Sequence, residues 1–263
     1  MSNEELIAVR EKAQVAVQEV GEFVLGAWEN EQVVSYKAEE EPVTQVDIQA
    51  EEMLVERLAG LVPGAGFLRE EGESDEREEY NWTIDPIDQT KNFIARIPLF
   101  YVQIALLHKG EPVLGIIYNP VSKQLFSASH GDGAYLNDVR VHPALQDSLS
   151  RVTVDLDIGG SDPDIAWRLS YMGRLMEASY RIRITAGAFS PYLLTGGFLG
   201  ASVVLNQKTK IVDQMPRRAL LEEAGFVTKY LEIDGRRVII YAGEKLAKEI
   251  AQLFHTTPSK GVC

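Results

Sequence analysis

Cysteine and long apolar runs are the features that this sequence most clearly lacks. The one cysteine is the last residue, Cys263, so no internal disulfide can form, which fits a reducing cytoplasm. The chain has no apolar run long enough to span a membrane, and residues 1–5 have neither the basic nor the apolar region of a signal peptide. The sequence therefore predicts a soluble, cytoplasmic protein that does not associate with membranes.

The sequence also has few basic side chains compared with acidic ones. The chain has 26 basic and 39 acidic side chains, which gives a net charge of −13 at pH 7. Such a field repels nucleic acid and anionic membrane surfaces, so we expect neither as a partner. The same sign disfavours a phosphorylated substrate unless cations lie in the site, and several carboxylates close together would recruit such cations.

Length and composition are those of an ordinary globular protein. With 263 residues and a hydrophobic fraction of 45%, the chain can form one large domain or two closely packed ones. It contains no internal repeat, low-complexity tract or long linker. We expect an N-terminal half at residues 1–143, a C-terminal half at 144–255 and a frayed tail at 256–263.

The first half combines two helices with a set of strands. Ser2 and Glu5 form a capping box, and apolar residues three and four apart extend this first helix to about Trp28. A second helix begins near Thr44 and stops at Pro63. Short β-branched or aromatic runs then indicate neighbouring strands of one mainly antiparallel sheet, at 66–68, 82–84, 100–107, 113–118 and 124–127.

The second half alternates between strand and helix patterns. Strands are predicted at 152–156, 181–185 and 200–205, and helices at 164–177, between the second and third strands, and at 217–224. This alternation is typical of a layered α/β unit.

Residues 82–93 carry the most informative pattern. A strand runs into Asp85, Pro86 should interrupt its ladder, and Asp88 follows at a turn that leads into a short helix. Two carboxylates so placed can converge on one point, and with the Ile87 carbonyl they supply the hard oxygen ligands that Mg²⁺ prefers. Taken alone, this pattern is also that of an ordinary loop, because Asp and Pro are common turn formers.

The order of several such motifs resembles the inositol-monophosphatase superfamily, which includes fructose-1,6-bisphosphatases, histidinol-phosphate phosphatases and phosphoadenosine-phosphate phosphatases. Its motifs are Asp-x-x-Thr-x-x-Asp, then Glu-Glu, then Trp-x-Ile-Asp-Pro-x-Asp-Gly-Thr-x-Asn-Phe. The chain matches them with Glu41 at the first Asp and with Thr44, Asp47, Glu70, Glu71, Trp82, Ile84, Asp85, Pro86, Asp88, Thr90, Asn92 and Phe93. Residues 115–120 and 131–137 also resemble the family. The resemblance implies an αβαβα layered sandwich.

The resemblance also implies a mechanism: Mg²⁺-dependent hydrolysis of a small phosphomonoester, such as inositol monophosphate or a related sugar or polyol phosphate. One ion would be held by Glu70, Asp85 and the Ile87 carbonyl, and a second by Asp85, Asp88 and Asp213, with two or three ions in all and Mn²⁺ as a substitute. Thr90, hydrogen-bonded to Asp47, would orient the attacking water, so the implied catalytic residues are Asp47, Glu70 and Thr90. The implied substrate-binding residues are Glu70, Ile87, Asp88, Gln89, Thr90, Ile184, Thr185, Ala186 and Asp213. Family members often dimerise, so a homodimer is expected as well.

The chain departs from the family pattern at several positions. Gln89 stands where the family has a glycine whose amide lies against the phosphate. Val212 replaces a tryptophan before Asp213, and the residues after Asp213 are larger than the small ones of the family. A gapless placement puts Ile184 at a glycine and Val203 at an acidic residue that contacts inositol hydroxyls. These departures leave open a catalytically impaired binding or regulatory protein. The four histidines fall outside the matched motifs and are expected at the surface or in turns.

Overall fold

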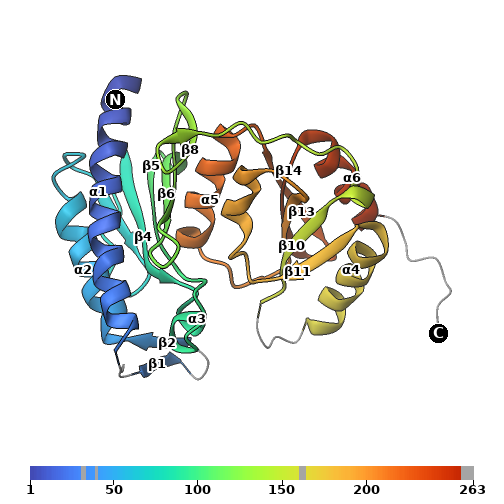
Figure 1. Cartoon of the computed structure of the whole chain (residues 1–263), viewed down its shortest axis with the longest axis horizontal. Coiled ribbons are helices and arrows are strands. Elements are labelled where there is room, and N and C mark those ends of the chain that lie inside the picture. The colour runs from blue at the N-terminus through green and yellow to red at the C-terminus, as the bar shows by residue number, and fades with distance from the viewer. Residues whose placement is uncertain (31–33, 39–40, 160–163, 256–263) are drawn as a thin grey trace. The chain divides into compact units, whose positions relative to one another are not determined.

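The computed structural model describes residues 1–30, 34–38, 41–159 and 164–255, and the predicted tail at 256–263 lies outside them. The chain forms two compact units (Figure 1). The first consists of Met1–Val141 and Lys210–Ala224, and the second of His142–Thr209 and the chain from Gly225 onward. The sequence division near residue 143 placed Asp213 in the C-terminal half, whereas the structure places it in the first unit.

The two predicted N-terminal helices are present in the first unit. Helix α1 (Asn3–Trp28) begins with a capping box, in which the Glu5 carboxylate accepts a hydrogen bond from the Ser2 amide at 2.7 Å. Helix α2 (Gln45–Leu58) is capped in the same way by Thr44 and Asp47. Among the described residues, no helix is long and apolar enough to cross a membrane.

A seven-stranded mixed sheet forms the centre of the first unit. Its order is β3-β4-β5-β6-β7-β8-β9, in which only β3 and β4 are parallel neighbours. The strands are β3 (Gly66–Arg69), β4 (Tyr80–Asp88), β5 (Tyr101–His108), β6 (Glu111–Asn119), β7 (Gln124–Ser129), β8 (Gly133–Leu136) and β9 (Val139–Arg140). A separate pair, β1 (Val34–Ala38) and β2 (Glu41–Thr44), precedes α2 and was not predicted.

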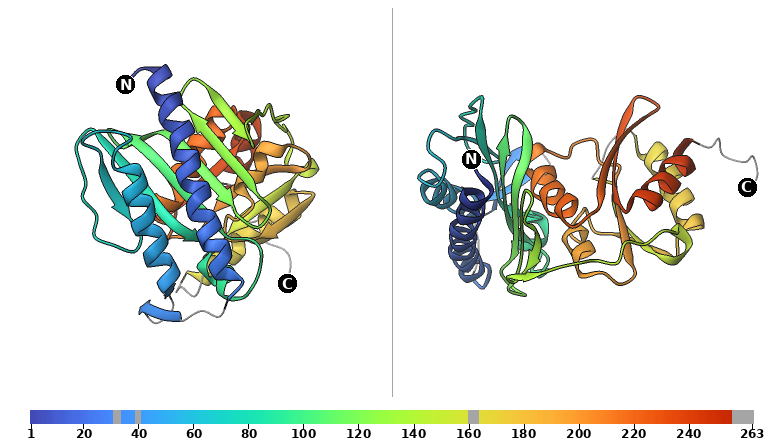
Figure 2. Two further views of the ribbon diagram at one scale, coloured as in Figure 1. Left: turned by 60° about the vertical axis from the view of Figure 1, so that its left-hand side comes forward. Right: turned by 90° about the horizontal axis from the view of Figure 1, so that it is seen from above.

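Helices cover both faces of this sheet (Figure 2). Helices α1 and α2 pack on one face, where Trp82, Ile84 and Leu54 are fully buried. Helix α5 (Ile211–Glu223) packs on the other face, and the contact is close at Gly115. A Cβ atom there would lie 2.7 Å from both the Pro216 carbonyl oxygen and the Ala219 Cβ atom. The glycine is therefore required for α5 to approach β6 so closely.

The second unit has a five-stranded mixed sheet of order β11-β10-β12-β14-β13. Its strands are β10 (Thr153–Asp157), β11 (Arg181–Ile184), β12 (Leu199–Val204), β13 (Val227–Ile233) and β14 (Arg236–Ala242), and its helices are α4 (Ile165–Ala178) and α6 (Glu244–His255), with short 3₁₀ turns at Leu149–Arg151 and Ser190–Thr195. Strand β10 is parallel to β11 and β12, whereas β14 is antiparallel to β12 and β13. The layered α/β architecture expected from the sequence is thus confirmed.

Three local expectations need correction. Pro86 does not end its strand: β4 continues to Asp88, with a register shift between Asp85 and Asp88. The helix expected at 217–224 begins earlier, at Ile211, and contains Pro216 in its interior. The segment between β11 and β12 forms the 3₁₀ turn Ser190–Thr195 rather than an α-helix. Proline misled the first two predictions, because a bulge and a helix packed on a sheet both accommodate it.

Candidate active site

The irregular end of β4 positions the first two carboxylates. Asp85 pairs with Gln103 of β5, and Asp88 pairs with Tyr101, so the two aspartates are separated by a bulge that contains Pro86 and Ile87. A bulge bends its strand and redirects side chains. Both aspartates are buried, and α3 (Thr90–Ile94) begins two residues after Asp88.

Asp85, Asp88 and Asp213 form a group whose carboxylate oxygens lie within 4.8 Å of one another. The pKa of each carboxyl is raised by burial and by its acidic neighbours, and that of Asp213 rises to about 7. Without a cation this arrangement is electrostatically unfavourable. A set of carboxylate oxygens at this spacing, with Asp85 and Asp88 buried and Asp213 partly buried, fits a divalent ion such as Mg²⁺, which prefers carboxylate and carbonyl ligands.

Hydrogen bonds fix the orientation of Asp85. The Ile87 amide donates to one Asp85 oxygen at 3.0 Å, and the Gln103 side chain donates to the other at 2.8 Å. Gln103 is fully buried on β5. Sequence reasoning missed it, although it is the one amide side chain in the apolar run 100–107. Such outer partners hold metal-binding carboxylates in place.

The N-terminus of α5 positions Asp213. The Asp213 carboxylate accepts a hydrogen bond from the Lys210 amide at 2.8 Å, so the same residue caps its own helix. One turn later, Arg217 donates to Asp88 Oδ2 at 3.1 Å, and this guanidinium is only 4% exposed. Sequence reasoning missed Arg217. The one sequence feature that could have pointed to it is that the residues after Asp213 are larger than the small residues of the family pattern.

Glu70 lies on the loop after β3 and is close enough to raise the pKa of all three aspartates. The ammonium group of Lys210 lies 3.1 Å from Glu70 Oε1. The loop itself is held by Glu51 of α2, which accepts hydrogen bonds from the amides of Glu71 and Gly72 at 2.9 and 2.8 Å. Glu51 was also missed, because on the sequence it is one of many acidic helix residues.

Thr90 and Asp47 lie close together, and the role that the family resemblance implies for them stays a prediction. The Thr90 hydroxyl is 2.9 Å from the Ile87 carbonyl and 3.4 Å from Asp47 Oδ1. A hydroxyl has a single proton, so the shorter contact with Ile87 is the better hydrogen bond in this state. Asp47 is fully buried, and burial raises its pKa, although its hydrogen bonds from Thr44 act in the opposite direction.

Gln89, which stands where the family pattern has a glycine, has a left-handed backbone conformation that glycine adopts readily. Its φ of 69° and ψ of 45° are those of the left-handed region, which is unfavourable for a residue with a side chain. Its side-chain nitrogen Nε2 lies 3.4 Å from Asp88 Oδ1. Glu41, the family match before Thr44, has a side chain outside the described part of the structure.

The remaining predicted residues lie in the second unit. Ile184 is half-exposed at the end of β11, and Ala186 has a positive φ of 51° in the following turn. The hydroxyl of Thr185 donates to Asp155, a buried aspartate that also accepts from Ser202. Val203 is fully buried on β12. Their role in substrate binding stays a prediction.

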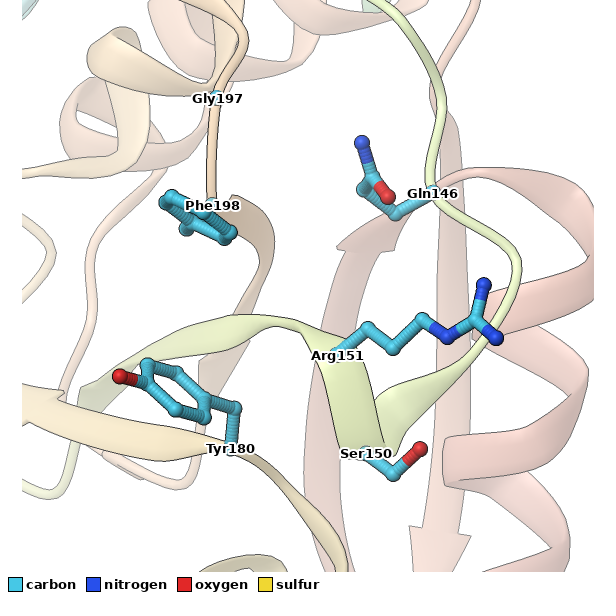
Figure 3. A pocket seen from close by; sticks show the side chains of 6 residues that line it. All are labelled: Gln146, Ser150, Arg151, Tyr180, Gly197 and Phe198. Atoms are coloured by element: carbon cyan, nitrogen blue, oxygen red, sulfur yellow. The ribbon is translucent and has the colours of Figure 1, made fainter.

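A recess of about 490 Å³ also belongs to the second unit. In Figure 3 the rings of Tyr180 and Phe198 lie on one side of it, and the side chains of Gln146, Ser150 and Arg151 on the other. None of the predicted site residues lines it. The carboxylates that can hold a cation are therefore found elsewhere, in the first unit.

Comparisons with known proteins agree with this geometry. The sequence model of the inositol monophosphatase family matches residues 3–258. The chain therefore belongs to the inositol monophosphatase family. An inositol-1-monophosphatase of Mesorhizobium japonicum is 42% identical over 113 residues, which span 42% of each chain. An inositol monophosphatase of Dictyostelium discoideum is 32% identical over 67% of this chain and 68% of its own length.

The fold is that of the inositol monophosphatase family as well. A crystal structure of the extragenic suppressor protein suhB from Bartonella henselae has a TM-score of 0.86 and 27% sequence identity, and the match covers 97% of this chain and all of that one. In the Mesorhizobium relative the matched stretch spans less than half of the protein. Family membership and fold thus apply to the whole chain, whereas the sequence likeness to individual relatives is more local.

Proposed function

We propose that this protein is a Mg²⁺-dependent phosphomonoesterase that acts on a small phosphorylated metabolite. The observation that carries this proposal is the cluster of Asp85, Asp88 and Asp213, with carboxylate oxygens within 4.8 Å of one another and the first two residues buried. Glu70 and the Ile87 carbonyl would complete the ligand set. Mn²⁺ is expected to replace Mg²⁺, because both accept a set of oxygen ligands.

A divalent ion bound here would supply a Lewis acid that lowers the pKa of water and stabilises charge on phosphate oxygens. The residues of the chain orient the reactants. Gln103 and the Ile87 amide keep Asp85 in one orientation, and Glu51 keeps the loop of Glu70 in place. A site held in this way needs little rearrangement when a phosphate ester binds.

Thr90 and Asp47 are the proposed proton-handling pair. With substrate bound, the Thr90 hydroxyl would accept a hydrogen bond from the attacking water and donate its own proton to Asp47, now 3.4 Å away. The Thr90 hydroxyl would then lose its 2.9 Å hydrogen bond to the Ile87 carbonyl, which is proposed to bind the metal ion instead. The amides of Gln89 and Thr90 are the proposed contacts for a phosphate oxygen.

Substrate selection is proposed to involve Ile184, Thr185 and Ala186 of the second unit. Val203, at the position where inositol-hydrolysing members have an acidic residue, is buried and apolar. It cannot accept the hydrogen bonds that this acidic residue accepts from inositol hydroxyls, so we favour a related sugar or polyol phosphate over inositol monophosphate itself. A homodimer and a cytoplasmic location stay predictions.

The test is phosphate release from a panel of substrates with and without Mg²⁺. The panel contains inositol phosphates, fructose 1,6-bisphosphate, histidinol phosphate and phosphoadenosine phosphate. We expect selective turnover of one class that disappears when the ion is chelated. Release that is equal with and without chelator would contradict the proposal.

A catalytically impaired binding or regulatory protein is the second candidate. The strained glutamine at position 89 and the buried arginine beside Asp88 favour it, because both alter the surroundings of the carboxylates. This candidate predicts divalent-ion binding without turnover of any substrate in the panel. Phosphate release from the panel therefore distinguishes the two candidates, when it is measured on a preparation that binds the divalent ion.

A further inference from the structure

Arg217 gives the carboxylate cluster a permanent cation of its own. The residue lies on α5 one turn after Asp213, and its Nη2 atom donates to Asp88 Oδ2 at 3.1 Å. The side chain is only 4% exposed. An arginine keeps its proton at any pH that a protein tolerates, so this charge is present whether or not a metal ion is bound.

The charges around the cluster can be compared directly. The carboxylates of Asp85, Asp88 and Asp213 lie within reach of one another, and Glu70 raises the pKa of each. In the described part of the chain, Arg217 contacts Asp88 and Lys210 contacts Glu70 at 3.1 Å. These cations already offset part of the negative charge, so a second divalent ion gains less attraction here than it would from the carboxylates alone.

The position of the guanidinium matters as much as its charge. The second ion that the family resemblance implies would be held by Asp85, Asp88 and Asp213. Asp88 Oδ2 already accepts a hydrogen bond from Arg217, and a divalent ion near this oxygen would be repelled by the guanidinium in a site with little water to screen the charges.

We propose that Arg217 supplies the positive charge of the second cation, so that this chain holds one divalent ion where the resemblance implies two or three. The inference rests on the proposed function, because it assumes that the carboxylates bind such an ion. It makes Arg217 a positioning residue that determines the metal content of the site. A purely structural role, in which the ion pair only anchors α5 to β4, predicts no change in metal content when the arginine is replaced.

The experiment is a calorimetric titration of the metal-free full-length protein with Mn²⁺. We expect one Mn²⁺ ion per chain for the wild type and two for Arg217→Met, which removes the charge but keeps much of the volume. Arg217→Lys, which keeps the charge, should again bind one. The matched control is Arg10→Met, because Arg10 is a buried arginine of the same unit that pairs with Asp132 at 2.9 Å, and it should leave the count at one.

Thermal melting gives a second measurement. Without Arg217 the carboxylates repel one another more strongly, so Mn²⁺ should raise the melting temperature of Arg217→Met more than that of the wild type. Two ions in the wild type, or one ion in a folded Arg217→Met, would overturn the inference. If Arg217→Met does not fold, the wild-type and Arg217→Lys titrations still decide, because two ions in either overturn it.

The same titration separates this inference from the proposed function. A wild type that binds two ions and releases phosphate would overturn only the role of Arg217. A wild type that binds no ion and shows no Mg²⁺-dependent turnover would overturn the proposed function itself.

Discussion

A buried carboxylate in each of the two units can be compared by the groups that surround it. In the second unit, Asp155 accepts hydrogen bonds from the hydroxyls of Thr185 and Ser202. In the first unit, Asp85 has two donors, but Asp88, Asp213 and Glu70 lie close enough to raise its pKa strongly. Hydrogen-bond donors stabilise a buried carboxylate directly. Several buried carboxylates that repel one another instead favour a bound cation.

This difference suggests separate roles for the two units, with metal binding in the first and substrate selection in the second. The first unit retains the carboxylates that the family resemblance requires, and it holds them with partners such as Gln103 and Glu51. In the second unit the sequence is expected to depart from the family pattern at Ile184 and Val203, and Thr185 donates a hydrogen bond to Asp155 of the same unit. We therefore expect substitutions in the first unit to affect metal binding and turnover, and those in the second to affect substrate choice or stability.

The largest expected effect is on turnover. Thr90→Ala and Asp47→Asn should each lower kcat by about 10²- to 10⁴-fold with little change in KM, because we propose that the pair orients the attacking water. The double variant should be little worse than the poorer single one, since the two residues act together. Steady-state kinetics on the best substrate checks this. Lost stability with unchanged kcat would make both residues simple helix caps.

A comparison of two buried aspartates tests the contrast between the units. Asp85→Asn should weaken Mg²⁺ binding by more than about 100-fold, beyond the effect of losing an outer partner. Asp155→Asn should leave the affinity unchanged, because Asp155 lies in the second unit and accepts hydrogen bonds from two hydroxyls there. Isothermal titration calorimetry measures both, with circular dichroism to confirm folding. Equal losses of affinity would mean that the assignment of the metal site to the first unit is wrong.

The family-like half was the more predictable part of both fold and site. A capping box and apolar residues three and four apart predicted α1, a helix start at Thr44 predicted α2, and short β-branched or aromatic runs predicted most strands of the first unit, since these signals act locally. The motif order predicted that Asp85, Asp88 and Asp213 converge. Arg217 and Glu51 could not be found in this way, because a buried ion pair joins residues far apart in the chain and leaves no periodic signal. Strands β13 and β14 went unpredicted as well.

Two glycines provide a third comparison, with effects of opposite sign. Gly115→Ala should destabilise the protein by about 1–3 kcal/mol, because its Cβ would lie 2.7 Å from a backbone oxygen of α5. Gly173→Ala, within α4 of the second unit, has nothing within 4 Å of the new Cβ and should stabilise by about 0.5–1 kcal/mol. Urea unfolding of both variants checks this. A neutral Gly115→Ala would show that α5 can shift away from β6 at little cost.

The acidity of the cluster predicts a pH dependence of stability. The pKa of Asp213 rises to about 7 in the folded chain, from about 3.8 in the unfolded one. The unfolded chain therefore releases this proton first, and the metal-free protein loses stability as pH rises from about 4 to 7. Its melting temperature in chelator should fall by several degrees between pH 5 and pH 7.5. Asp213→Asn should flatten this fall, and a wild type whose melting temperature rises over this range would contradict the assignment.

The smallest effect concerns Gln89, whose backbone has a left-handed conformation. Gln89→Gly should stabilise the protein by about 0.5–1 kcal/mol, because glycine adopts a positive φ without steric cost. The same change should raise kcat/KM, since it opens the approach to the amides proposed to contact phosphate. Gln89→Ala separates the two causes: it keeps most of the backbone strain but removes the side chain that lies 3.4 Å from Asp88. If the side chain obstructs phosphate, Ala and Gly will both raise kcat/KM, and only Gly will raise the melting temperature. An equal or lower kcat/KM in both variants would instead mean that the site has adapted to glutamine, with its amide holding Asp88 in position.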